Sequence, residues 1–186
     1  MSVTSPAERE ELNRLLIETG RSDQKAFAEL YRRTSSKLFG VCLRMLRDRG
    51  EAEEVLQETY TTVWRRAGSF DAAKASAITW LVTLSRNKAI DRLRQHREEL
   101  LDDPERMHET VDEQPTPAAD AESSQEYRRL EQCMQELEPQ QRSSLREAFF
   151  TGATYNELAT RSKVPLGTMK SWIRRSLMQL RTCLDQ

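Results

Sequence analysis

Apolar residues recur at helical spacing through most of the chain, and this pattern restricts the fold more than any other feature. Within residues 26–46 they lie three and four positions apart, and residues 52–67 keep this period over four turns. A third run begins near Ser76 and ends in the basic stretch 92–97. No run alternates with the period of two that a half-buried strand requires, and only six glycines and six prolines interrupt the 186 residues. The sequence therefore predicts an all-α protein.

Acidic residues are concentrated in residues 98–126. This segment has eleven acids against one base, Arg106, so it carries a charge of −10 and the rest of the chain carries +9, because the formal net charge is −1. Three prolines and few large apolar residues leave it unable to bury enough surface to offset the entropy of ordering. We expect a flexible acidic linker between two small helical domains, residues 1–97 and 127–186. Both domains are net basic, which suits a nucleic-acid partner.

The second domain contains a helix-turn-helix pattern. A helix over residues 140–150 is expected to end at Gly152, and a short helix over 155–163 is followed by the turn Val164-Pro165-Leu166-Gly167. A longer helix is expected from Thr168 to Cys183. Its predicted buried stripe consists of Met169, Ile173, Leu177, Leu180 and Leu184.

The opposite face of this last helix carries the groups that could read DNA, namely Lys170, Ser171, Arg174 and Arg175. Thr168 is expected near the helix N-terminus, where its hydroxyl could cap the helix and the first amides could meet a phosphate. Arginine and lysine can donate paired hydrogen bonds to guanine, and serine can serve a base or a phosphate. A solvated charged face is the alternative, but the clustering of bases at the start of the helix favours DNA contact.

Four motifs, in order, resemble extracytoplasmic-function (ECF) sigma factors of bacterial RNA polymerase. The fourth conserved region is similar to residues 154–159 and 165–171, introduced by Leu137-Glu138-Pro139-Gln140-Gln141-Arg142. The second conserved region is similar to the acidic residues 48–58 and to the promoter-melting helix over residues 80–94. The resemblance extends from Ala26 to Leu180, and it implies a sigma factor that gives core polymerase its promoter specificity.

The resemblance also implies a role for each group of residues. The acidic helix would dock on the clamp helices of the largest polymerase subunit through Asp48, Glu51, Glu53, Glu54, Gln57 and Glu58. On spacing alone these would be a solvated acidic face. The recognition-helix residues Thr168, Lys170, Ser171, Arg174 and Arg175 would read the minus-thirty-five element. Trp172 stands where the family commonly has a basic residue, which removes an expected phosphate contact.

The promoter-melting residues implied by the resemblance are Phe70, Asn87, Lys88, Asp91 and Arg92. Asn87 and Asp91 lie four apart on one helical face, where amide and carboxylate groups could read a flipped base of the minus-ten element. Phe70 offers a stacking surface, and Lys88, Arg92 and Arg97 would hold the backbone. A helix-surface Asn87 and a core Phe70 are the structural alternatives, while Trp64 and Trp80 are expected to be packing residues.

The remaining expectations concern partners and chemistry. We expect core RNA polymerase (its clamp helices and flap region), promoter DNA and an anti-sigma factor as partners, in the cytoplasm, with no membrane insertion. No phosphate loop or nucleophile elbow is present, so no enzyme, cofactor or metal is expected. Alternative functions are a stand-alone helix-turn-helix regulator and a helical adaptor. Cys42, Cys133 and Cys183 are odd in number and widely spaced, so a disulfide is not expected and we interpret them as small apolar residues in a reducing compartment.

Overall fold

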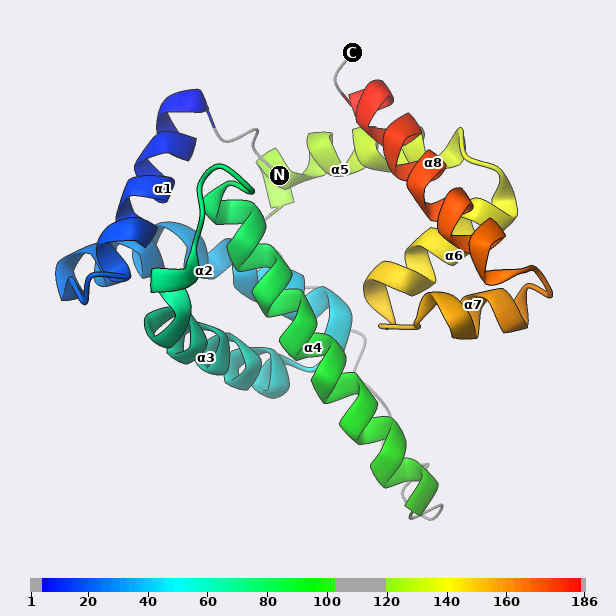
Figure 1. The fold of residues 1–186 in the computed structure, drawn as a ribbon, viewed down its shortest axis with the longest axis horizontal. Coiled ribbons are helices and arrows are strands. Elements are labelled where there is room, and N and C mark those ends of the chain that lie inside the picture. The colour runs from blue at the N-terminus through cyan, green and yellow to red at the C-terminus, as the bar shows by residue number, and fades with distance from the viewer. Residues whose placement is uncertain (1–4, 103–119, 185–186) are drawn as a thin grey trace. The chain divides into compact units, whose positions relative to one another are not determined.

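The computed structural model describes residues 5–102 and 120–184, and every regular element within these ranges is helical (Figure 1). The helices form two compact units. The N-terminal unit contains α1 (Pro6–Thr19), α2 (Gln24–Leu46), α3 (Arg49–Arg66), the short 3₁₀ helix η1 (Ala67–Ser69) and α4 (Ala77–Asp102). The C-terminal unit contains α5 (Asp120–Gln135), α6 (Pro139–Phe150), α7 (Tyr155–Arg161) and α8 (Leu166–Leu184). The all-α fold with two helical domains is confirmed.

Helix boundaries follow the local chemistry of the chain. Asp23 and Asp48 cap α2 and α3 by accepting hydrogen bonds from backbone amides in the first turn. Thr154 and Glu157 form a reciprocal capping box at the start of α7. Gly152, two residues after the end of α6, takes a positive φ of 69° that favours glycine.

The core of the N-terminal unit lies where α2 packs against α1, α3 and α4. Leu16, Leu30, Leu38 and Leu81 are fully buried in it. The polar pair Thr34 and Tyr60 is buried among these side chains, and their hydroxyls form a hydrogen bond of 2.7 Å. Buried polar groups that satisfy each other in this way fix the register of α2 against α3.

Helix α1 was not predicted as a separate element, because its apolar positions are few. It is nevertheless held closely, since Leu12, Leu15 and Leu16 are buried and the Asn13 side chain accepts a hydrogen bond of 2.7 Å from the Ala77 amide at the start of α4. Gly20, directly after α1, lies against the backbone of η1. A Cβ at Gly20 would be 2.8 Å from the amide nitrogen of Gly68, so this contact requires glycine.

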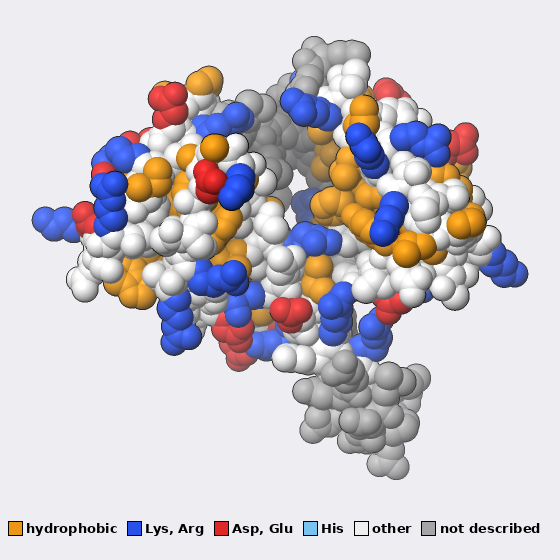
Figure 2. All heavy atoms as spheres, viewed as in Figure 1, with side chains coloured by type: hydrophobic (Ala, Val, Ile, Leu, Met, Phe, Trp, Pro, Cys, Tyr) orange, Lys and Arg blue, Asp and Glu red, His pale blue; other side chains and the backbone are white. Residues whose placement is uncertain are grey.

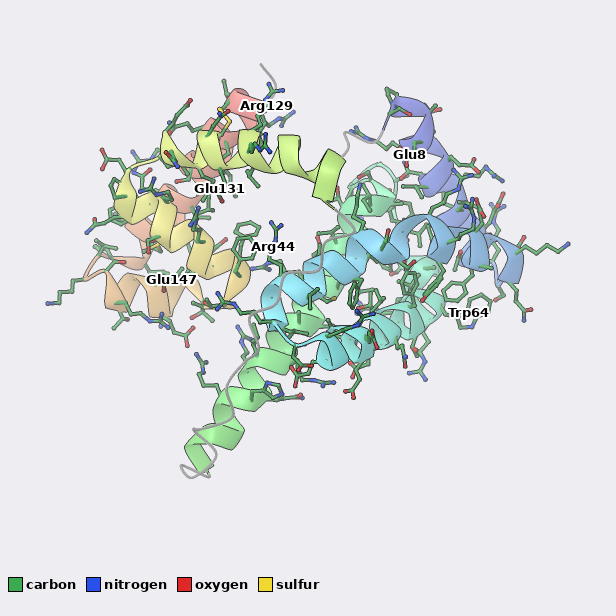
Figure 3. The ribbon with its side chains drawn as sticks, turned by 180° about the vertical axis from the view of Figure 1, so that it is seen from behind. Glu8, Arg44, Trp64, Arg129, Glu131 and Glu147 are labelled. Atoms are coloured by element: carbon green, nitrogen blue, oxygen red, sulfur yellow. A yellow bond between two sulfur atoms is a disulfide. The ribbon has the colours of Figure 1, made fainter. Side chains whose placement is uncertain are left out.

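The C-terminal unit packs α8 against α5, α6 and α7 around Leu137, Leu145, Leu158 and Met169. Two ion pairs join its shorter helices. Arg146 on α6 bonds Glu131 on α5 at 2.6 Å, and Arg161 on α7 bonds Glu147 on α6 at 2.8 Å. Figure 3 labels both carboxylates on the ribbon of this unit.

The expectation that no disulfide forms was wrong. Cys133 near the end of α5 and Cys183 near the end of α8 form a disulfide, with the Cα atoms 5.8 Å apart (Figure 3). The sequence spacing of 50 residues concealed the pair, because only the packing of α5 against α8 brings the two helix ends together. Cys42 is a free, buried thiol, as expected of a small apolar residue.

The ends of the predicted acidic linker are helical, since α4 continues to Asp102 and α5 begins at Asp120. Residues 103–119 lie outside the described part of the chain. None of the helices within the described ranges is long and apolar enough to cross a membrane.

Candidate nucleic-acid and polymerase interfaces

The recognition helix α8 separates an apolar face from a basic face. Met169, Ile173 and Leu180 are buried, whereas Lys170 and Arg174 are exposed. Ser171 and Arg175 also lie on the exposed side, but they are partly engaged. The Ser171 hydroxyl donates to the Gly167 carbonyl at 2.9 Å, and Arg175 Nε donates to the Ser171 carbonyl at 3.4 Å.

Two sequence-based details of this helix were wrong. Leu177 and Leu184 are 42% and 37% exposed, and Ser176 takes the buried position instead. A smaller side chain fits there because α8 lies close to α6, where the Gln141 side chain reaches the Ser176 hydroxyl at 3.4 Å. Helix α8 also begins at Leu166, so Thr168 lies within its first turn rather than at the cap.

Trp172 has a packing role that accounts for its place among basic residues. It is half-buried and contacts the core of the C-terminal unit. The position therefore contributes to the packing of α8 on the core. Figure 2 shows hydrophobic side chains gathered on one face of this unit, and Leu177, Met178 and Leu184 of α8 are among its exposed large apolar residues.

The six predicted polymerase-docking residues all lie on α3 or at its cap. Asp48 is the N-cap and accepts a hydrogen bond of 2.8 Å from the Glu51 amide. Glu51 pairs with His96 of α4 at 2.8 Å, and Glu53 pairs with Arg49 at 3.0 Å on the same helix. Gln57 is exposed.

A groove continues this face of α3 toward its C-terminal end, and the sequence did not reveal it. The groove has a volume of about 580 Å³ and is lined by Gln24, Phe27, Tyr31, Gln57, Tyr60, Thr61 and Trp64. Phe27 makes edge contacts with both Tyr60 and Trp64, at centroid distances of 6.1 and 5.2 Å. Trp64, expected to be a packing residue, is 37% exposed at the surface of α3 (Figure 3). Its contact with α2, which makes it a wall of the groove, depends on helix packing and not on helical period.

The predicted minus-ten residues lie on α4 and at Phe70, directly after η1. Asn87 and Asp91 are exposed on α4, one turn apart. Phe70 is half-buried and packs edge-on against Trp80 at 6.1 Å. Trp80 is itself partly buried against the core, in agreement with a packing role.

Two of the predicted cations of α4, Lys88 and Arg92, turn toward α3 and meet its acids. Arg92 bonds Glu54 at 3.0 Å and Glu58 at 3.1 Å, while Lys88 bonds Glu58 at 3.3 Å. The hydrogen bond to Glu54 is the main reason that the pKa of Arg92 is raised above its usual value. The structure thus brings together residues that the sequence assigned to two different partners.

Two family assignments match the two helical units. Residues 30–99 match Sigma-70 region 2, and residues 133–182 match Sigma-70 region 4. The chain belongs to the sigma-70 family, and within it to the ECF RNA polymerase sigma factors. As such it binds core RNA polymerase and promoter DNA and directs promoter-specific initiation of transcription, which decides against a stand-alone regulator.

Two similar proteins from mycobacteria both carry the name SigK. The chain is 39% identical over 176 residues to the ECF RNA polymerase sigma factor SigK of Mycobacterium bovis (strain BCG / Pasteur 1173P2), covering 94% of each chain. It is 36% identical over 181 residues to the SigK of Mycobacterium ulcerans (strain Agy99), covering 97% of each chain. Among solved structures, Rhodobacter sphaeroides SigE in complex with the anti-sigma ChrR is 33% identical, with a TM-score of 0.45 and coverage of 94% of this chain and 98% of that one.

Proposed function

We propose that α8 reads the minus-thirty-five element while α4 and Phe70 read and open the minus-ten element. The single observation that carries this proposal is the split of α8 into a buried face at Met169 and Ile173 and an exposed face at Lys170 and Arg174. An exposed pair one turn apart fits the width of a major groove, where arginine discriminates guanine by about 1–3 kcal/mol. Ser171, Arg175 and Thr168 complete the proposed reading surface.

The two parts of the proposal correspond to domains with the boundaries 1–97 and 127–186. Exposed Asn87 and Asp91 would contact unpaired bases, and Phe70 would provide a stacking surface after a shift away from Trp80. The chain supplies binding and positioning only, so it acts as an initiation factor and not as an enzyme. Because it works together with core RNA polymerase, its site of action is the cytoplasm. The bond-forming chemistry is left to polymerase.

Polymerase docking is proposed for the outer face of α3. The partner would meet exposed carboxylates of Glu53 and Glu54 at one end and the aromatic groove at Trp64 at the other. Such a surface suits a partner helix that carries basic and apolar side chains, and the clamp helices of the largest subunit are the expected partner. The flap region would contact the C-terminal unit.

An anti-sigma factor is the third proposed partner, as the ECF family implies. Exposed Leu177 and Met178 on α8 provide apolar surface for it. The test is co-purification from the native host, followed by addition of the isolated partner to a transcription reaction. Inhibition of promoter-specific transcription supports this proposal, and unchanged transcription at a saturating concentration contradicts it.

Run-off transcription with purified core polymerase tests the main proposal. Arg174→Ala should reduce promoter-specific transcripts about tenfold or more, because 1.4 kcal/mol corresponds to a factor of ten. Arg128→Ala removes the same charge from an exposed position on α5 and is the matched control. Equal losses for the two variants would show that α8 contributes charge alone and does not read sequence.

A second experiment separates melting from binding. Asn87→Ala should slow the appearance of permanganate-reactive thymines at the promoter while leaving closed-complex affinity within about twofold. Equal losses in the two measurements contradict a role of Asn87 in melting. If no genomic template gives a promoter-specific transcript with the wild-type chain, the whole assignment fails.

A further inference from the structure

Four charged side chains join α3 to α4 in a contact that we call the α3–α4 ladder, made of Glu54, Glu58, Lys88 and Arg92. Both carboxylate oxygens of Glu58 are occupied, since Oε2 accepts from Lys88 Nζ at 3.3 Å and Oε1 from Arg92 Nη2 at 3.1 Å. Arg92 uses its second terminal nitrogen to donate to Glu54 at 3.0 Å. The guanidinium therefore spans two carboxylates.

Exposure is distributed unevenly across the ladder. The side chains of Lys88 and Arg92 are 27% and 19% exposed, whereas those of Glu58 and Glu54 are 50% and 67% exposed. The acids are thus more accessible to a cationic partner than the bases are to a phosphate. A phosphate approaching Lys88 or Arg92 meets a cation that is already paired with a carboxylate.

The base-reading groups of α4, in contrast to its two paired cations, are accessible to solvent. Asn87 and Asp91 are exposed. In the free chain, α4 therefore presents groups that can read base edges, while two of the cations that would hold the backbone, Lys88 and Arg92, are paired. Since phosphate contacts supply most of the affinity of non-specific DNA binding, this arrangement disfavours DNA binding by the free protein.

We propose that the α3–α4 ladder is an autoinhibitory contact that keeps Lys88 and Arg92 from single-stranded DNA until a basic protein surface engages Glu54 and Glu58. This inference rests on the proposed function, because it takes α3 as the polymerase face and α4 as the DNA face. When cations of polymerase bind the two carboxylates, Lys88 and Arg92 lose their partners and accept DNA phosphates instead. Ion pairs near the surface contribute little to stability, so such an exchange is within reach of ordinary interface contacts.

The test measures binding of the full chain, without polymerase, to a fluorescein-labelled, mixed-sequence single-stranded DNA as NaCl is varied. Glu58→Gln should bind several-fold more tightly at low salt. Its plot of log K against log salt should be steeper by at least about 0.7, the contribution of one released cation on single strands, because Lys88 loses its ladder partner while Arg92 keeps Glu54. Glu54→Gln should give a smaller gain, because Glu54 contacts only Arg92 within the ladder.

Glu29→Gln is the matched control. Glu29 lies on α2 and, like Glu58, accepts from two bases, Arg32 at 2.6 Å and Arg33 at 2.5 Å. Its substitution removes the same charge and should leave the affinity within about twofold. In a Lys88→Gln/Arg92→Gln background, Glu58→Gln should give no gain beyond that of Glu29→Gln. Thermal unfolding of each variant establishes that the fold is retained.

The outcomes distinguish the inference from the proposed function. If Glu58→Gln binds no better than Glu29→Gln, or if its gain persists without Lys88 and Arg92, the autoinhibitory contact is refuted. If Lys88→Gln/Arg92→Gln leaves promoter opening by the holoenzyme unchanged, the assignment of these bases to minus-ten DNA fails. Slower promoter opening in that variant, together with the gain of Glu58→Gln in the free chain, supports both.

Discussion

Opening the Cys133–Cys183 disulfide should destabilise the C-terminal unit by an amount comparable with its whole stability. The bond closes a loop of 50 residues, and the loop-entropy relation gives about 14 cal/mol/K, or about 4 kcal/mol at 25 °C. A small unit of this kind has a free energy of unfolding on the order of 3–9 kcal/mol. Its melting temperature should therefore fall by roughly 15–30 °C on reduction, at about 4–8 °C per kcal/mol.

Differential scanning calorimetry of the full chain, with and without a phosphine reductant, measures this effect. The transition of the N-terminal unit is an internal control, because its cysteine, Cys42, is not bonded. Cys133→Ala/Cys183→Ala should melt at the lower temperature and should not respond to reductant. If mass spectrometry shows the bond fully reduced while the C-terminal transition loses less than about 1 kcal/mol, the loop-entropy argument is refuted for this protein.

Three further predictions concern single positions. Gly20→Ala should destabilise the N-terminal unit by about 1–3 kcal/mol, because the new Cβ would be 2.8 Å from the Gly68 nitrogen. Gly40→Ala, in open space on α2, should instead stabilise the unit by up to about 1 kcal/mol. Urea unfolding measures the free energy of unfolding of both variants, and equal effects contradict the argument. Burial raises the pKa of Cys42 to about 11 from a usual value of 9.0. The stability that comes from its neutral thiol is therefore complete below pH 9 and is lost as the pH rises toward 11. The free energy of unfolding should fall by about 3 kcal/mol over this range. Cys42→Ala should remove that loss, and an unchanged alkaline profile would exclude Cys42 as its cause. Thr154→Ala should destabilise the C-terminal unit by about 1 kcal/mol through loss of the capping box, as thermal unfolding will show, and no change would mean that the cap contributes nothing.

The sequence was most informative where structure follows from neighbours along the chain. Helices α2, α3 and α6 lie within three residues of their predicted positions, because helical period, an N-capping aspartate or a first-turn proline acts within a few residues. The helix-turn-helix and its two-domain setting were predicted from the same local signals. The start of α8 was misplaced, since Leu166 and Gly167 were taken as turn residues although both lie in its first turn.

Pattern reasoning was less reliable for burial on α8. A strict apolar stripe placed Leu177 inside and left Ser176 without a role, but the geometry of α6 against α8 exposes the leucine and buries the serine. The closeness of a neighbouring helix sets the size of the side chain that fits, and periodicity carries no information about that distance.

What the sequence alone determined is the list of charged residues: acids along α3, bases and an amide along α4, and bases along α8. What only the tertiary structure decided is which of these charges meet. The packing of α3 against α4 places Glu58 between Lys88 and Arg92, and the packing of α5 on α8 joins Cys133 to Cys183. The physical reason is that a helical period fixes the face on which a residue lies, whereas an ion pair or a disulfide requires an approach of a few ångströms between faces that are distant along the chain.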